Sequence, residues 1–103
     1  MLRGVVEPLM LFMISEFPSH GYRIAKEIER RSAGYFHLTA STVYSALRRL
    51  EEDGLVRSTW ETISGGPRRR YYHLTEKGRE ILHLKLDEWE RFSLAAEQVL
   101  ALT

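Results

Sequence analysis

The sequence predicts a mainly α fold with one small β-hairpin (α+β). Apolar residues recur at helical spacing in four separate segments, and two β-favouring runs late in the chain flank a Gly-Gly turn. Capping residues and glycines mark the ends of these segments. The chain has 103 residues, which is enough for one domain with one modest core.

The composition excludes several classes of protein. The chain has no cysteine, so disulfides and thiolate metal sites are excluded, and we expect a cytoplasmic protein because this composition fits a reducing compartment. The longest apolar run, LMLFMI, is much shorter than the roughly 18 residues that a membrane span needs. No signal-peptide cleavage pattern accompanies this run. We therefore expect neither secretion nor membrane binding.

No motif for catalysis or for a cofactor is present. The 4 histidines lack the spacing of metal ligands. The sequence also lacks a recognisable nucleophile motif, an acid–base pair of carboxylates and a phosphate-binding loop. We therefore expect no enzyme activity, no metal site and no cofactor.

The first predicted helix spans residues 4–16. Its sequence, GVVEPLMLFMISE, carries apolar residues on every side, which is typical of a helix buried on more than one face. Pro8 is tolerated if the helix begins near Glu7 or if the proline lies in the first turn, and otherwise it kinks the helix.

The second predicted helix spans residues 20–32 and follows a break at FPSHG. Ser19 is the expected N-cap. Ile24, Ala25 and Ile28 lie on one face of this helix, and the remaining face is charged. The pattern predicts an amphipathic helix at the surface.

The third helix has the clearest signals, because its start, apolar stripe and stop agree. Thr39 is the expected N-cap, and Gly54 ends the helix in a Schellman motif that folds Leu55 back onto Leu50. The stripe at helical spacing comprises Val43, Ala46, Leu47 and Leu50. The opposite face is small and polar near its start and cationic further on, with Ser41, Ser45 and Arg48 at its centre and Thr42, Tyr44 and Arg49 beside them.

A β-hairpin follows, with strands over residues 55–62 and 68–74. The segment ISGGP between them is the expected turn, and Gly65, Gly66 and Pro67 form its tip. Side chains alternate along a strand, so Arg70, Tyr72 and Leu74 share one face and Arg69, Tyr71 and His73 share the other.

Thr75 caps a final helix that spans residues 76–102. This helix is longer than a compact module needs, and its apolar residues form two adjacent stripes. One stripe comprises Leu82, Leu86, Trp89, Ala96 and Leu100, and the other comprises Ile81, Phe92, Ala95, Val99 and Leu102. One stripe is expected to cover the core of the domain. The second is left in water, so we expect a homodimer formed through this helix and the first helix.

Three helices followed by a hairpin is the order of a winged helix, in which the third helix enters the major groove of DNA and the hairpin lies over the neighbouring backbone. Guanidinium groups at the hairpin suit phosphate contact because they stay charged and donate in a planar fork. The predicted DNA contacts are Tyr22, Lys26, Ser41, Thr42, Tyr44, Ser45, Arg48, Arg49, Gly66, Arg68, Arg69 and Arg70. The alternatives are a solvated arginine run, and core packing for the ring of Tyr22.

Three blocks, HGYRIAKEIE, TASTVYSALRRLEEDGLV and GGPRRRYYHLTEKG, resemble the PadR family of bacterial transcriptional regulators over residues 4–90. The resemblance implies a winged-helix DNA-binding domain over residues 1–75 and a dimerisation helix over 76–103, in one compact unit. It further implies a repressor that binds a two-fold related operator in double-stranded DNA and is released by a small effector. The alternative function is a winged-helix protein-interaction module that does not bind DNA.

The single C-terminal helix is similar to that of the small PadR subclass, which includes multidrug-sensing repressors. In that subclass a tryptophan of the last helix stacks flat aromatic compounds at the dimer interface, and DEWERF places Trp89 at the corresponding position. The resemblance implies a ligand site at Trp89, Phe92 and Ser93, whereas the alternative for Trp89 is packing of the dimer interface. The sequence departs from the family pattern at Pro8 and at the polar Ser93.

Overall fold

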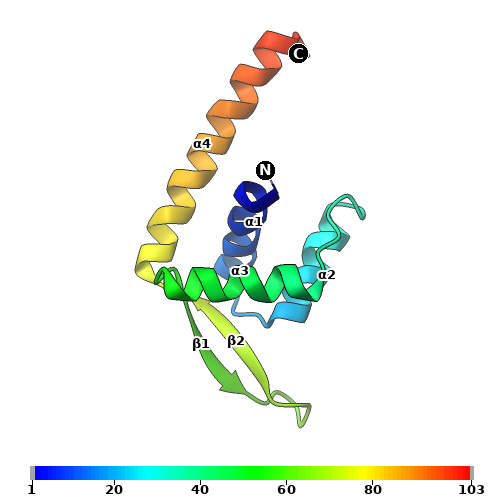
Figure 1. Cartoon of the computed structure of the whole chain (residues 1–103), viewed down its shortest axis with the longest axis vertical. Helices are drawn as coiled ribbons and strands as arrows, with labels where there is room; N and C mark the ends of the chain where they lie inside the picture. Colours follow the sequence, from blue (N-terminus) through cyan, green and yellow to red (C-terminus); the bar gives the residue numbers. More distant parts are fainter. Residues whose placement is uncertain (1, 103) are drawn as a thin grey trace.

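The computed structural model describes residues 2–102, and it has the predicted α+β fold (Figure 1). The elements in chain order are α1 (Leu2–Glu16), α2 (Gly21–Arg31), α3 (Ala40–Glu52), β1 (Val56–Glu61), β2 (Arg69–Leu74) and α4 (Glu76–Leu100). The molecule measures 52 × 29 × 21 Å. It is elongated because α4 projects from the helical body in one direction and the hairpin projects in the opposite one.

Helix α1 supplies a large part of the core. Its buried residues lie on two sides of the helix, as its sequence predicts: Val6, Met10, Leu11, Met13 and Ile14. Pro8 stands inside the continuous helix, neither in its first turn nor at its start. The proline has no N–H to bond the carbonyl of Gly4, so α1 tolerates one missing backbone hydrogen bond.

The predicted N-cap of α2 was wrong by one residue. His20 caps this helix, and its Nδ1 accepts a hydrogen bond of 3.3 Å from the backbone N–H of Arg23. Ser19 is only 1% exposed, and its backbone pairs with Tyr72 of β2 through bonds of 3.3 and 2.9 Å. This long-range bridge takes Ser19 away from the helix and ties the hairpin to the loop after α1.

Helix α3 has the predicted cap, stripe and stop. The Thr39 side chain accepts a hydrogen bond of 3.2 Å from the N–H of Thr42. The apolar stripe is buried at Val43, Ala46, Leu47 and Leu50. Gly54 has a φ of +75°, and the Leu55 N–H bonds the Leu50 carbonyl at 2.9 Å, which is the hydrogen bond of a Schellman motif.

The two strands pair antiparallel in the register from Val56 opposite Leu74 to Glu61 opposite Arg69. The turn centres on Ser64 and Gly65, which have φ values of 54° and 72°. The N–H of Gly66 closes the turn on the carbonyl of Ile63 at 3.0 Å. Positive φ at both central residues is the geometry that suits tight hairpins. The central residues of the turn, Ser64 and Gly65, thus begin one residue before the predicted tip.

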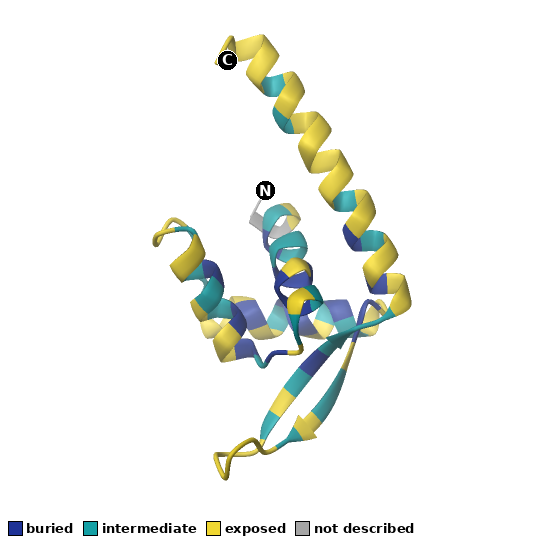
Figure 2. Ribbon diagram, turned by 180° about the vertical axis from the view of Figure 1, so that it is seen from behind, coloured by how far each residue is buried: buried dark blue, intermediate teal, exposed yellow. Residues whose placement is uncertain are grey.

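Helix α4 contacts the core only near its start. Thr75 caps it by accepting a hydrogen bond of 3.0 Å from the Gly78 N–H, and Leu82 is buried. A Cβ at residue 78 would overlap the carbonyl of Leu55, so the glycine allows α4 to meet the root of the hairpin. The rest of the helix is largely exposed (Figure 2).

The expectation that one stripe of α4 covers the core was therefore wrong beyond Leu82 and Ile81, which contact it. Large apolar side chains from both stripes and beside them are exposed: Leu84, Leu86, Trp89, Phe92, Leu94, Val99, Leu100 and Leu102. None of the helices described between residues 2 and 102 is long and apolar enough to cross a membrane.

Candidate nucleic-acid interface

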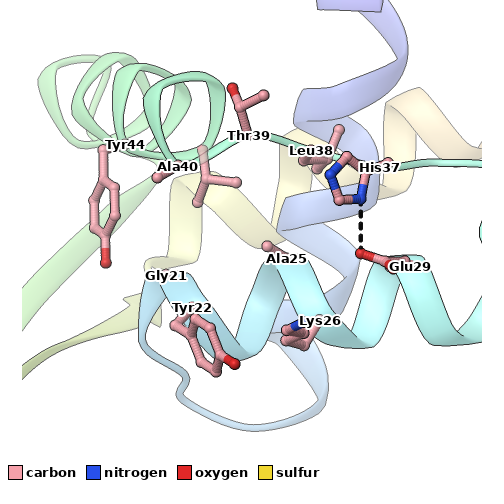
Figure 3. A pocket seen from close by; sticks show the side chains of 11 residues that line it. Gly21, Tyr22, Ala25, Lys26, Glu29, His37, Leu38, Thr39, Ala40 and Tyr44 are labelled. Atoms are coloured by element: carbon pink, nitrogen blue, oxygen red, sulfur yellow. Dashed lines mark hydrogen bonds and ion pairs between the residues drawn. The ribbon is translucent and has the colours of Figure 1, made fainter.

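Two hollows that share Tyr44 lie where α2, α3 and the hairpin meet. The first, of about 390 Å³, opens between α2 and the start of α3 (Figure 3). Figure 3 shows Tyr22 and Lys26 on α2, and Tyr44 extending from α3 toward the start of α2. Its lining comprises Gly21, Tyr22, Ala25, Lys26, Glu29, His37, Leu38, Thr39, Ala40, Val43 and Tyr44.

The ring of Tyr22 lies at the surface. Tyr22 is 59% exposed, so its ring does not pack in the core. Lys26 Nζ lies 5.6 Å from the centroid of the Tyr22 ring, and the guanidinium carbon of Arg69 lies 6.0 Å from it. The phenol is therefore at the surface beside two cations that come from α2 and β2.

The polar face of α3 is accessible at four of the predicted contacts. Ser41, Thr42, Tyr44 and Arg48 are exposed, and Ser45 is half-buried. Tyr44 is central because it lines both hollows. These side chains present hydroxyl groups near the start of the helix and a guanidinium one turn later, all of which can donate to DNA.

Arg49 is the predicted contact that the structure places elsewhere. Its Nε donates a hydrogen bond of 3.0 Å to Glu7 Oε2 on α1, and both side chains are largely covered. The carboxylate neutralises the guanidinium and draws it toward α1. The residue therefore joins α1 and α3, and its contact with DNA stays a prediction.

The second hollow, of about 410 Å³, lies between α3 and the hairpin. Its lining comprises His20, Tyr44, Trp60, Arg68, Arg69, Arg70 and Tyr72. All three arginines of the predicted run thus face one space. Burial raises the pKa of the Tyr72 phenol, which stays neutral at the floor where β2 enters the core.

The three arginines have different surroundings. Arg68 is exposed, and its guanidinium carbon lies 5.3 Å from the centroid of the Trp60 ring. Arg70 lies 5.7 Å from the same centroid, donates a hydrogen bond of 2.8 Å to Ser58 Oγ and lies 3.8 Å from Glu51. Arg69 is half-buried, with Nη1 at 3.3 Å from His20 Nδ1.

Trp60 and His20 are site residues that the sequence pattern did not indicate. Trp60 lies opposite Arg70 in the strand register, and this pairing follows from the hairpin once its turn is known. Burial lowers the pKa of His20, and the charges of Arg69 and Arg23 lower it further. The ring is therefore neutral at physiological pH, as its role as hydrogen-bond acceptor at the N-cap requires.

Gly21 is a third residue that the pattern did not indicate. A Cβ at this position would lie 2.9 Å from two ring carbons of Tyr44. Only glycine therefore lets the Tyr44 ring pack against the start of α2. At the hairpin tip, Gly66 is exposed, and a Cβ there would lie 3.2 Å from the Ile63 carbonyl oxygen.

The predicted ligand residues lie on α4, which projects away from the hairpin (Figure 1). Trp89 is 57% exposed and Phe92 is 66% exposed, with their ring centroids 6.1 Å apart at 37°. Ser93 is half-buried. The two rings are thus exposed to solvent in the single chain, with the polar Ser93 beside them.

Comparisons with known proteins agree with this geometry. The model of the Transcriptional regulator PadR-like family matches residues 10–84. The solved structure of a PadR-like transcriptional regulator from Bacillus cereus is 30% identical, with a TM-score of 0.86 over 97% of this chain and 95% of that one. A PadR family transcription regulator from Clostridium difficile is 33% identical, with a TM-score of 0.81 over 92% of this chain and 97% of that one.

A probable transcriptional regulator of Mycobacterium tuberculosis is 34% identical over 71% of this chain but only 39% of its own length. The matched residues 10–84 include α3, the hairpin and the start of α4. The chain thus belongs to the PadR-like family of transcriptional regulators.

Proposed function

We propose that the chain is a cytoplasmic repressor that binds a two-fold related operator in double-stranded DNA as a homodimer. The observation that carries this proposal is the continuous surface around Tyr44, which joins two hollows. Tyr22 and Lys26 line one side of it, and Arg68, Arg69 and Arg70 line the other. Cations and hydroxyl groups on both sides of a helix suit a duplex whose groove takes the helix and whose phosphates flank it.

The two proposed roles, DNA binding and dimerisation, belong to consecutive segments of the chain. Residues 1–75 form the DNA-binding part, and residues 76–103 form the dimerisation helix. The exposed apolar residues of α4, from Leu84 to Leu100, and Leu102 just after it support this division because a surface of that kind is costly in water. A second copy of the chain would cover it and hold two DNA-binding parts at a fixed spacing.

The proposed effector site lies at Trp89, Phe92 and Ser93, as in the small PadR subclass with one C-terminal helix. The two exposed rings support it because flat aromatic compounds stack well on such surfaces. Binding of the effector between two copies would release the operator. Flat aromatic compounds are expected to quench tryptophan fluorescence in the wild-type chain and far less in Trp89→Ala. Equal quenching in both would point to Trp60 or to non-specific association.

The salt dependence of DNA affinity tests the DNA-binding part. Each phosphate neutralised contributes about 0.9 to the slope of log affinity against log salt concentration. Replacing Arg68, Arg69 and Arg70 together by alanine is expected to lower this slope by about 2.7 if each contacts one phosphate, with Arg79→Ala as the control on exposed α4. An unchanged slope in the triple variant would remove the hairpin from the DNA-binding surface.

A further inference from the structure

The second hollow has an unbalanced positive charge. Three arginines line it, and none of the seven lining residues in the described chain carries a carboxylate. The nearest acidic contact is Glu51, 3.8 Å from Arg70. A concave surface with several cations and low-dielectric walls concentrates the positive potential, which favours an anion inside it.

Among the described residues 2–102, neither Arg68 nor Arg69 has an ion pair with a carboxylate, and of these two arginines Arg69 is the half-buried one. Arg70 is engaged by Ser58 and Glu51. The nearest polar neighbour of Arg69 is the neutral ring of His20 at 3.3 Å. We assign the proton of the neutral ring to Nε2, because Nδ1 accepts the N-cap hydrogen bond. Arg69 Nη1 lies 3.4 Å from this Nε2, so the two N–H donors are side by side. Arg69 and His20 are thus both available to donate to one acceptor.

We propose that this hollow seats one phosphodiester of the DNA backbone together with its deoxyribose. Arg69, His20 Nε2–H and the Tyr44 hydroxyl donate to the phosphate oxygens, and the rings of Trp60 and Tyr44 form the wall that covers the sugar. This inference rests on the proposed function and assigns one particular backbone contact to residues from the α1–α2 loop, α3 and both strands.

The lining favours a backbone unit over a free ion. A volume of about 410 Å³ is far larger than an inorganic phosphate requires. The lining also combines cations with three aromatic rings, and this combination matches the alternation of phosphate and sugar along a strand. A free phosphate would use the cations and leave the rings without a contact.

The test measures binding of a short DNA duplex from the promoter region of the chain's own gene. Removing one phosphate contact lowers the affinity about 8-fold at about 0.1 M salt, because the slope falls by about 0.9. Arg69→Gln is expected to show this loss, and Arg79→Gln on α4 serves as its control. Tyr44→Phe and His20→Asn are each expected to lower the affinity about 2- to 10-fold with little change of slope, since each loses a neutral donor.

Both conservative variants keep the local structure. Phenylalanine retains the ring that packs against Gly21, and asparagine is a good N-cap. Thermal unfolding of each variant checks that the fold is retained. Tyr35→Phe is the matched control for Tyr44→Phe, because Tyr35 is exposed on the loop before α3 and lies outside both hollows.

Methylphosphonates, placed one at a time in the duplex, locate the phosphate. At one position in each half-site, neutralisation is expected to cost the wild type about 8-fold and Arg69→Gln less than about 2-fold. Equal losses in the two proteins at every position would overturn the inference while leaving DNA binding intact. If millimolar inorganic phosphate at constant ionic strength displaces the duplex from the wild type, the inference that the hollow prefers a backbone unit to a free phosphate would be overturned. If the wild type fails to bind the duplex at low salt, the proposed function itself falls.

Discussion

The hairpin end and the α4 end of the molecule differ in how their functional side chains are held. At the hairpin end, stacking on Trp60, a hydrogen bond to Ser58 and contact with His20 position the arginines. At the α4 end, Trp89 and Phe92 contact each other and are otherwise largely exposed. Contacts within one chain therefore hold the arginines in place, whereas the two rings on α4 have few contacts within one chain.

The largest expected effect is at the α4 end. Phe92→Asp places a charge on the proposed dimer surface, and we expect the dimer to weaken more than about 100-fold, because burying an unpaired charge costs several kcal/mol. Sedimentation equilibrium measures the dissociation constant of the dimer. Glu90→Gln, at a neighbouring exposed polar position, is the control and is expected to leave dimerisation unchanged. A Phe92→Asp variant that dimerises like the wild type would place the interface elsewhere.

The next largest effect is expected on stability at Gly78, where α4 meets the root of the hairpin. Gly78→Ala forces α4 away from the carbonyl of Leu55, and overpacking of this kind costs about 1–3 kcal/mol of unfolding free energy. Urea unfolding measures this free energy. Gly4→Ala is the control, because a Cβ there meets nothing within 4 Å and alanine favours the helix. Equal stabilities would show that the junction adjusts freely.

At the hairpin end, Gly21→Ala is expected to displace the Tyr44 ring, which lies 2.9 Å from the new methyl position. The affinity for DNA should fall by about 10-fold, which corresponds to about 1.4 kcal/mol. Fluorescence anisotropy with a labelled duplex measures the change. In a Tyr44→Ala background the same substitution should have little further effect, and additive losses would contradict the mechanism.

The smallest expected effect is the pH dependence due to His20. Burial, Arg69 and Arg23 lower its pKa from the ordinary value of 6.5, so the unfolded chain binds more protons below that pH. The stabilisation is complete above about pH 6.5 and is lost as the pH falls toward the folded-state pKa. Unfolding free energies measured at a series of pH values should show a slope that His20→Asn removes. His83→Asn, exposed on α4, should retain it.

The same two regions show what the sequence could predict. Helix α3 was predictable because Thr39, its apolar stripe and Gly54 act locally, within a few residues of one another. The assignment of side chains to the two faces of the hairpin was predictable because side chains alternate along a strand. The long final helix and its apolar stripes were also visible, but the pattern could not show that only the first turns of α4 contact the core.

The remaining differences come from contacts between residues far apart in the chain. Ser19 has the chemistry of an N-cap, but its backbone pairs with Tyr72, and His20 takes the cap instead. Arg49 lies next to the predicted DNA face of α3, but Glu7, 42 residues earlier, binds it. A local pattern carries no information about either partner.

The bridge between Ser19 and Tyr72 consists of main-chain atoms alone. Ordinary replacements at these two positions leave its N–H and C=O groups in place, and proline alone among the common residues lacks the donor. The two hydrogen bonds that attach the hairpin here therefore do not depend on which side chains stand at these positions. Its arginines can change, and with them the strength of the proposed contacts to the DNA backbone, while the strand that carries them stays attached at the same place.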